Sequence, residues 1–196
     1  GWNAKAKTWF EWGVTLEGER FAWTRLPESP HTQHLAPCVS ADLLAVLPDG
    51  FTTEVCPAAA DWWRKATSVL QRGKLLTLDY GLTAEEFFVP HRREGTLRAY
   101  RNHQVSGDLL ANPGDQDLTA HVNFTAIQTA GEAAGLITEV FSAQMRFLVR
   151  IAEQTWRNKE SFGEWNEERL WQFKTLTHPE QLGRAFRVLV QSRLGN

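Results

Sequence analysis

The sequence predicts an α/β fold that supplies the C-terminal half of a doubly wound sheet, with an N-terminal β-hairpin and a helical insert. Three observations favour this fold. Helix and strand patterns alternate from residue 40 to the end of the chain. The apolar run at residues 74–78 directly follows a helix, which is typical of a central strand buried on both faces in a parallel sheet. Only three core strands can be identified, so some neighbours of that central strand are expected to lie outside this sequence.

Composition excludes several classes of protein. The 196 residues are 42% hydrophobic and 22% charged, which excludes a disordered chain. A net charge of −2 argues against binding to nucleic acid or to a membrane surface through bulk charge. No apolar run approaches the roughly 20 residues of a membrane span. Cys38 and Cys56 are too few for a disulfide framework or a four-cysteine zinc site, so we expect inert, reduced thiols and a cytoplasmic location.

The N-terminal region is expected to be an insertion at residues 1–37. Gly1-Trp2-Asn3 has neither an initiator Met nor the apolar stretch of a signal peptide, so we expect the chain to be a piece of a longer protein. Apolar and polar residues alternate over 9–26 on either side of Glu17-Gly18, which predicts a β-hairpin. A loop rich in Pro, His, Ser and Thr follows.

Four elements are expected between this loop and residue 82. They are a helix at 41–47 capped by Ser40, a short strand at 51–55, a helix from Pro57 to Gly73, and a strand over 74–81. The last strand ends in Asp79-Tyr80-Gly81, which places polar groups where open α/β sheets bind ligands. Residues 82–122 are predicted to be mostly loop. Because they are rich in Arg, His, Tyr and Asp, we expect an ordered segment that lines a site.

Helices dominate the remainder. Asn123 is expected to cap a helix over 124–134, Ser142 a second helix and Asn166 a third, with strands at 136–141 and 185–191 and one more turn from Thr177. Residues 142–176 would then be a helical insert in a sheet domain of residues 38–141 and 177–196. The insert is rich in aromatic residues, namely Phe147, Trp156, Phe162, Trp165, Trp171 and Phe173. Two interpretations are open: a lid packed on the sheet, and a surface for a protein substrate or a second copy.

Several motifs together carry a resemblance to a known family. They are Leu47-Pro48-Asp49-Gly50, Glu54-Val55-Cys56-Pro57, Leu78-Asp79-Tyr80-Gly81, the segments 95–103 (GTLRAYRNH) and 113–124 (PGDQDLTAHVNF), and Phe186-Arg187-Val188-Leu189. In content and order they resemble the MidA-like family of S-adenosylmethionine-dependent methyltransferases, which includes protein-arginine methyltransferases. The resemblance extends over residues 9–191 and implies a Rossmann-like methyltransferase sheet.

The resemblance also implies which parts this sequence does not contain. Family members hold the methyl donor with a glycine-rich turn after the first strand and an acidic residue after the second. Neither feature occurs here, because Gly13 and Gly18 lie in the hairpin pattern. The chain therefore matches the C-terminal part of the family, and we expect it not to bind S-adenosylmethionine tightly by itself. Asn123 stands where an aspartate is usual, which leaves the helix cap intact.

Two aspartates, Asp79 and Asp117, are the candidates for catalysis. Transfer of a methyl group from a sulfonium is an in-line displacement in which the protein chiefly positions the nucleophile. For an arginine acceptor, carboxylates would orient the guanidinium and disperse its charge. The alternative for each is structural: hydrogen bonds to backbone amides for Asp79, and a turn cap for Asp117.

Five further residues are expected to bind substrate: Tyr80, Arg98, Tyr100, His103 and His121. The two tyrosines offer aromatic faces to a cation, or else pack in the core. Arg98 and Arg101 could hold a carboxylate of the cofactor or of Asp117, or else be ion-paired loop residues. The histidines between residues 91 and 121 lack metal-ligand spacing, so no metal site is expected.

These residues favour the acceptor-side portion of an S-adenosylmethionine-dependent methyltransferase, with a protein arginine as the acceptor implied by the resemblance alone. Two alternatives stay open. One is a non-catalytic interaction module derived from a methyltransferase, and the other is an enzyme whose missing half lies on another polypeptide. The expected partners are a protein substrate and either a second copy or the missing N-terminal half, with no nucleic acid and no membrane span.

Overall fold

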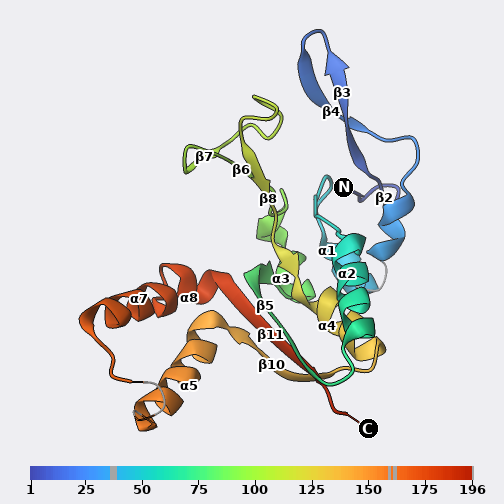
Figure 1. Cartoon of the computed structure of the whole chain (residues 1–196). Helices are drawn as coiled ribbons and strands as arrows, with labels where there is room; N and C mark the ends of the chain where they lie inside the picture. Colours follow the sequence, from blue (N-terminus) through green and yellow to red (C-terminus); the bar gives the residue numbers. More distant parts are fainter. Residues whose placement is uncertain (36–38, 159, 161–162, 196) are drawn as a thin grey trace. The chain divides into compact units, whose positions relative to one another are not determined.

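The structure is a computed structural model that describes residues 1–35, 39–158, 160 and 163–195 (Figure 1). The chain divides into two compact units. Unit 1 comprises Gly1–Ala58 and Leu82–Ala126, and unit 2 comprises Ala59–Gly81 and Ile127–Asn196. Both units are mixed α/β in content, as the fold class predicts at that level. The domain boundaries expected at residues 37, 141 and 177 stay predictions.

Unit 1 begins with four short strands. β1 (Trp2–Asn3) pairs with β2 (Thr8–Trp9), and β3 (Trp12–Glu17) pairs with β4 (Arg20–Arg25) to form the predicted hairpin. Glu17 lies opposite Arg20, so the turn has two residues, and Gly18 adopts a φ of 63° there. Two-residue hairpin turns require such left-handed backbone, which explains the glycine.

Local capping places the next helix, and tertiary bonds decide the segment after it. Following η1 (Pro30–His34), α1 (Ala41–Val46) begins where the Ser40 hydroxyl accepts a hydrogen bond from the Leu43 amide at 3.3 Å, as expected. The strand expected at 51–55 is wrong: within the described residues it forms only an isolated bridge between Thr52 and Glu94. Its backbone groups bond to a turn and to the N-terminus instead, since the Phe51 amide reaches Pro48 and its carbonyl accepts from Trp2.

Residues 82–122 contain more regular structure than the expected loop. A Thr83–Glu86 capping box starts α3 (Ala84–Phe87), and η3 (Pro90–Arg92) follows. A small antiparallel sheet then forms in the order β7 (Gln104–Ser106), β6 (Arg98–Arg101), β8 (Asp117–Thr119). These strands are too short to show a clear period of two, so the sequence does not predict them, and turns and irregular backbone still make up most of the segment, as expected. The segment has a defined fold, as expected of an ordered segment.

The core of unit 1 gathers residues from across its sequence. Seven side chains are buried together: Trp2, Leu35, Val39, Leu47, Phe51, Phe87 and Phe88. β9 (Val122–Asn123) then leads into α4 (Phe124–Ala133), where the Asn123 side chain accepts from the Ala126 amide at 3.1 Å, as expected of a cap. Helix α2 (Pro57–Val69) and α4 carry the chain between the two units.

The sheet of unit 2 places β11 (Phe186–Arg193) between β5 (Gly73–Leu82) and β10 (Ile137–Ala143). β11 runs antiparallel to both, so β5 and β10 are parallel to each other. Because its neighbour β11 is antiparallel, the expectation that β5 lies among parallel strands is wrong on that side, and one of its two faces is not buried. Leu76 and Leu78, on one face of β5, are 49% and 39% exposed.

A buried polar network holds the other side of this unit together. The Trp63 indole donates to the Gln191 side-chain oxygen at 2.7 Å, and the Gln191 amide donates to the Gln128 carbonyl and the Thr138 hydroxyl. Position 131 requires glycine, because a Cβ there would lie 1.9 Å from the Gln191 side-chain oxygen. Every polar group of the Gln191 side chain is thus satisfied, as burial requires.

The helical insert consists of α5 (Gln144–Arg157) and α7 (Glu167–Thr177), followed by the short α8 (Leu182–Ala185). Asn166 caps α7 as predicted, accepting from the Arg169 amide at 2.9 Å. The cap expected at Ser142 is wrong, because Ser142 continues β10 opposite Val188 and α5 begins two residues later. Among the described helices, none combines the length and apolar character needed to cross a membrane.

Three aromatic rings of the insert pack on one another. Trp165 lies 5.4 Å from Trp156 and 5.2 Å from Phe173, measured between ring centroids. Trp171 is 68% exposed, whereas the expected aromatic at Phe162 lies outside the described residues. The packed rings agree with a folded insert, and both interpretations of its outer surface stay open.

Candidate functional site

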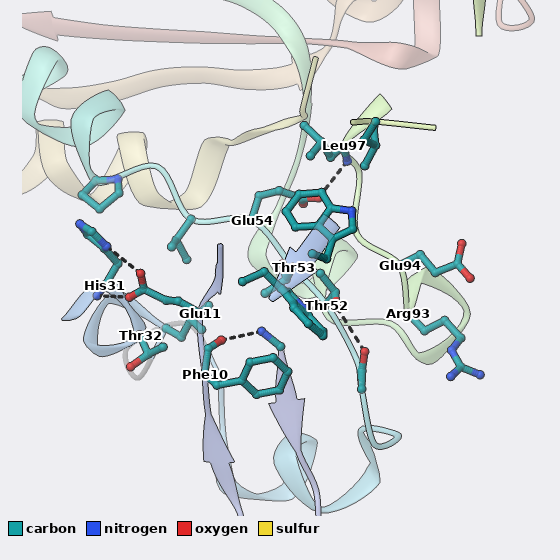
Figure 2. Close-up of a pocket in the computed structure, with 18 residues that line it drawn as sticks. Phe10, Glu11, His31, Thr32, Thr52, Thr53, Glu54, Arg93, Glu94 and Leu97 are labelled. Atoms are coloured by element: carbon teal, nitrogen blue, oxygen red, sulfur yellow. Dashed lines mark hydrogen bonds and ion pairs between the residues drawn. The ribbon is translucent and has the colours of Figure 1, made fainter. Parts of the chain in front are cut away.

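The carboxylate of Glu54 joins two motifs through a contact between residues 42 positions apart in the sequence. It accepts hydrogen bonds from the backbone amides of Thr96 and Leu97 at 2.7 and 2.8 Å, and from the Thr96 hydroxyl at 3.1 Å. Figure 2 shows the bond from Leu97. These are charge-assisted bonds, which are stronger than bonds between neutral groups. Glu54 therefore fixes the chain immediately before β6, the strand that carries Arg98 and Tyr100.

Gly95 and Thr96 leave space for this carboxylate and bond to it. Gly95 adopts a φ of 68°, and a Cβ at this position would lie 2.3 Å from a Glu54 oxygen. Thr96 is 2% exposed, and its hydroxyl accepts from the His121 amide at 2.9 Å while it donates to Glu54. A third motif, residues 113–124, is thereby tied to the other two. We call the residues Glu54, Gly95, Thr96 and His121 the Glu54 joint.

A pocket of about 670 Å³ lies beside the Glu54 joint within unit 1 (Figure 2). Its apolar wall comes from the hairpin region and from the loops around Glu54, and includes Phe10, Trp12, Trp23, Leu35, Val55 and Leu97. This volume and mainly apolar lining are those of pockets that hold a small molecule or a protein side chain.

The polar groups at the pocket are of both signs: Glu11, Glu54 and Glu94 line it together with His31, Arg93 and the N-terminal amine of Gly1. The Glu11 carboxylate lies 3.0 Å from the His31 ring nitrogen, and this hydrogen bond holds the pKa of Glu11 below its usual value. Arg25 stacks its guanidinium 3.8 Å from the centre of the Phe10 ring, a cation–π contact at the edge of the hairpin. The aromatic wall suits an apolar group, and the charged groups beside it do not favour one sign of ligand.

Three of the predicted site residues lie on one face of the small sheet in unit 1. Tyr100 lies directly opposite Asp117 on β8, and Arg98, two residues along β6, points to the same side. Asp117 is exposed and Tyr100 is 37% exposed, whereas Ala99 on the other face is fully buried. The structure therefore brings a carboxylate, a phenol ring and a guanidinium together on a surface open to a ligand.

The arginines make contacts other than the expected one. Arg98 donates to the Leu97 carbonyl at 2.6 Å, and Arg101 lies 4.0 Å from Asp115 rather than beside Asp117. His103 occupies the turn between β6 and β7 with a φ of 62° and is exposed. Among the residues that the structure describes, no three His, Cys, Asp or Glu side chains gather closely enough to hold a metal ion.

Asp79 and Tyr80 belong to unit 2, whereas Asp117 belongs to unit 1. On β5 they lie opposite Arg187 and Phe186, and the Asp79 carboxylate accepts from the Tyr80 amide at 2.7 Å. Tyr80 contacts Phe186 with ring centroids 3.9 Å apart and is 45% exposed. Cys56 is a free, exposed thiol, while Cys38 lies outside the described residues.

Sequence reasoning gave no role to Glu54 or Thr96, although both lie in motifs that carry the family resemblance. A signal was present in the sequence: an acidic residue three positions before the Pro57 that opens a helix, and a glycine before Thr96. Neither signal identifies Thr96 as the hydrogen-bond partner of Glu54, because the two residues are 42 positions apart in the sequence.

Comparison with known proteins identifies the family. Residues 2–142 match the family model described as "Putative S-adenosyl-L-methionine-dependent methyltransferase". The chain is 32% identical over 153 residues to "Protein arginine methyltransferase NDUFAF7, mitochondrial" of Xenopus laevis, which covers 73% of this chain and 33% of that relative. The Xenopus tropicalis protein of the same name is 32% identical over 151 residues, covering 72% of this chain and 33% of the relative.

Two solved structures from Burkholderia thailandensis are similar over 96% of this chain. One is a COG1565 superfamily member bound to S-adenosyl-homocysteine (TM-score 0.76, 28% identity, 48% of that chain covered). The other is an uncharacterized COG1565 superfamily protein (TM-score 0.80, 29% identity, 50% covered). The chain thus spans about a third of the curated relatives and about half of the solved chains. With the motifs, the fold and a family match over most of its length in agreement, this chain belongs to the MidA-like (COG1565) family of S-adenosyl-L-methionine-dependent methyltransferases.

Proposed function

We propose that this chain forms the acceptor side of a methyltransferase and that the acceptor is an arginine side chain of a protein. The observation that carries the proposal is the match of nearly the whole chain to half of a relative that holds S-adenosyl-homocysteine. The arginine acceptor is supported by the Xenopus relatives, which are named as protein arginine methyltransferases. A Rossmann-like sheet completed by a second half is part of the same proposal.

The residues of this chain do not fit the methyl donor by themselves. Gly13 lies within β3 and Gly18 in the hairpin turn, so neither follows a buried strand or begins a helix. A donor site of this fold class needs a glycine-rich turn whose helix N-terminus faces the ligand. We therefore propose that donor binding depends on a part of the enzyme that this sequence does not include.

The exposed face of the small sheet offers what an arginine acceptor needs. A guanidinium stays charged at any physiological pH and presents its N–H groups in a planar fork. A carboxylate such as that of Asp117 can accept two parallel hydrogen bonds from this fork. The ring of Tyr100 lies opposite that carboxylate and supplies an aromatic face for the same cation. In this proposal, Asp117 orients the acceptor and disperses its charge.

The test is a methyl-transfer assay on a protein that joins this chain to the donor-binding half of a relative. The substrates are short peptides that contain a single arginine, each compared with the same peptide carrying lysine. Asp117→Asn is expected to lower turnover at least tenfold, because the paired acceptor for the guanidinium fork is lost. Asp115→Asn is the matched control, since Asp115 is an exposed neighbour whose closest charged partner is Arg101. Equal turnover of both variants would remove Asp117 from the site, and transfer to the lysine peptides alone would contradict the arginine acceptor.

Donor binding is tested separately by calorimetric titration of the 196-residue chain with S-adenosylmethionine. No binding is expected in the micromolar range, which would agree with a donor site outside this chain. Micromolar affinity would contradict that part of the proposal and leave the acceptor assay unaffected.

A non-catalytic assembly module is the second candidate, and the exposed apolar residues of the hairpin favour it. Trp23, Phe21 and Leu16 are 45%, 47% and 62% exposed, which is unusual for residues with no partner to cover them. If the joined protein binds S-adenosylmethionine but transfers no methyl group to any peptide, the module is the better account.

A further inference from the structure

Strand β8 lies at the edge of the small sheet in unit 1. The strand order is β7, β6, β8, so β8 pairs with β6 on one side, and within the described ranges no strand pairs with its other side. All three residues of β8 are exposed. An edge strand presents unpaired backbone N–H and C=O groups to which a further strand can bond. We call the outer side of Asp117, Leu118 and Thr119 the β8 edge.

The chain is fixed on both sides of this strand. Before β8, the Gln116 side chain donates to the backbone carbonyls of Asp108 and Leu109 at 3.2 and 3.0 Å. After β8, the His121 amide donates to the threonine hydroxyl of the Glu54 joint at 2.9 Å. A strand that is already held at both ends loses little conformational freedom when a partner binds, which favours binding.

Asp117 gives the β8 edge a negative charge that the basic side chains of the sheet leave unpaired. The ion pairs of the described residues do not include its carboxylate. Arg98 donates to the Leu97 carbonyl instead, and Arg101 lies 4.0 Å from Asp115. A carboxylate on an edge strand disfavours most partners, but it stabilises a strand that places a cation directly opposite. Charge complementarity therefore favours a partner strand that carries a basic residue.

Leu118 offers an apolar contact on the other face of the same edge. It is 55% exposed, whereas Ala99, its partner on β6, is fully buried. Side chains alternate between the two faces along a strand, so a partner strand with one side chain beside Asp117 has its next side chain beside Leu118. The β8 edge thus fits an extended segment in which a cationic residue and an apolar residue are neighbours in sequence.

We propose that the acceptor segment of the protein substrate binds as an added strand along the β8 edge, with its arginine opposite Asp117 and an apolar neighbour beside Leu118. Main-chain hydrogen bonds of an added strand are a recurring mode of peptide recognition. Tyr100 lies on the next strand, about 4.8 Å further along the face of Asp117. This inference rests on the proposed arginine acceptor and adds to it an extended backbone and an apolar neighbour in the substrate.

Fluorescence anisotropy with the 196-residue chain tests the added strand. The probe is a short labelled peptide that contains one central arginine flanked by valines. Two further versions carry an N-methyl group on the backbone nitrogen, either of the arginine or of the residue after it. Because neighbouring N–H groups of a strand point to opposite sides, only one of these groups faces the β8 edge. One version is expected to bind at least about tenfold more weakly than the parent peptide, and the other to bind about as well. Equal affinities of the two versions, or a parent peptide that does not bind in the millimolar range, would overturn the proposal.

Leu118→Ser tests the apolar contact. It is expected to weaken the valine-flanked peptide about tenfold and to leave a glycine-flanked arginine peptide almost unchanged. Val105→Ser is the matched control, because Val105 is 63% exposed on β7, the strand at the opposite edge of the same sheet. Equal losses in the two variants, or for the two peptides, would show that Leu118 does not contact the neighbour of the arginine.

Methyl transfer by the joined protein separates this inference from the proposed function. Transfer to arginine peptides that is insensitive to the flanking residues and to both N-methyl groups would overturn the added strand and leave the arginine acceptor intact. Peptide binding with the expected pattern but without transfer would contradict the arginine acceptor alone. Peptide binding by the 196-residue chain but not by the joined protein would assign the β8 edge to the other half of the enzyme, and a dimer lost in Leu118→Ser would assign it to a second copy. Either of these last two results would overturn the proposal.

Discussion

Replacement of Glu54 by Ala is expected to destabilise unit 1 by about 3–4 kcal/mol. The carboxylate accepts three hydrogen bonds, from the Thr96 amide, the Leu97 amide and the Thr96 hydroxyl. Bonds to a charged acceptor contribute about 1.5–3 kcal/mol each, and their sum is reduced because the three share one acceptor group. Ala also leaves these donors without a protein acceptor in a region where Thr96 is almost fully buried.

The assay is urea unfolding combined with amide hydrogen exchange. Because the chain has two units, unfolding of unit 1 is followed by the exchange of residues 96–101 rather than by a single spectroscopic signal. Exchange at the Thr96 and Leu97 amides is expected to accelerate by about two orders of magnitude if 3 kcal/mol is lost. Glu54→Gln keeps one acceptor oxygen and is expected to lose less.

Glu94→Ala is the control for this prediction. Glu94 also lines the pocket but is exposed, so its replacement is expected to change stability by no more than about 0.5 kcal/mol. A loss below about 1 kcal/mol for Glu54→Ala, or unchanged exchange at Thr96 and Leu97, would refute the idea that Glu54 fixes the start of β6.

Three further predictions concern unit 2. Gly131→Ala places a Cβ 1.9 Å from the Gln191 oxygen, so the free energy of unfolding should fall by about 1–3 kcal/mol and the melting temperature should fall with it. Gly107→Ala is the control, because nothing lies within 4 Å of a Cβ at that position. Equal melting temperatures for the two variants would contradict the packing argument. The hydrogen bonds from Thr138 and Gln128 lower the pKa of Glu132. The stabilisation by the Glu132 carboxylate is therefore present above the unfolded pKa of about 4.3 and is lost as the pH falls through the lower folded pKa. The free energy of unfolding of Glu132→Gln should fall less steeply in acid than that of the unchanged chain, and identical slopes would refute this. The Ser142 hydroxyl is buried and has no hydrogen-bond partner among the residues described, so Ser142→Ala should be neutral or stabilising by about 1 kcal/mol, and a clear loss in urea unfolding would reveal an overlooked partner.

Local chemistry made several elements predictable from the sequence. The caps at Ser40, Asn123 and Asn166 each accept a hydrogen bond from an amide three residues later, so the necessary atoms lie within one helical turn. The hairpin follows for the same reason, since alternation and the glycine turn act over a few residues.

Ser142 shows where such reasoning fails. Its sequence context suits a helix cap, but pairing with Val188, 46 residues later, keeps it in β10. The strands β6, β7 and β8 were missed because each has only three or four residues, although the Asn102-His103 turn, with φ values of 51° and 62°, is a local hairpin signal at Asn102.

The sequence by itself determined the family, the alternation of helices and strands, and the residue types available to handle a cationic acceptor. These depend on patterns and neighbours within a few positions of one another. Only the tertiary structure decided that β11 runs antiparallel between β5 and β10, that Asp117 shares a face with Tyr100, and that Glu54 ties three motifs together. Each of these facts is a contact between segments far apart in the chain, and the free energy of such a contact is set by packing and hydrogen bonding that no short stretch of sequence contains.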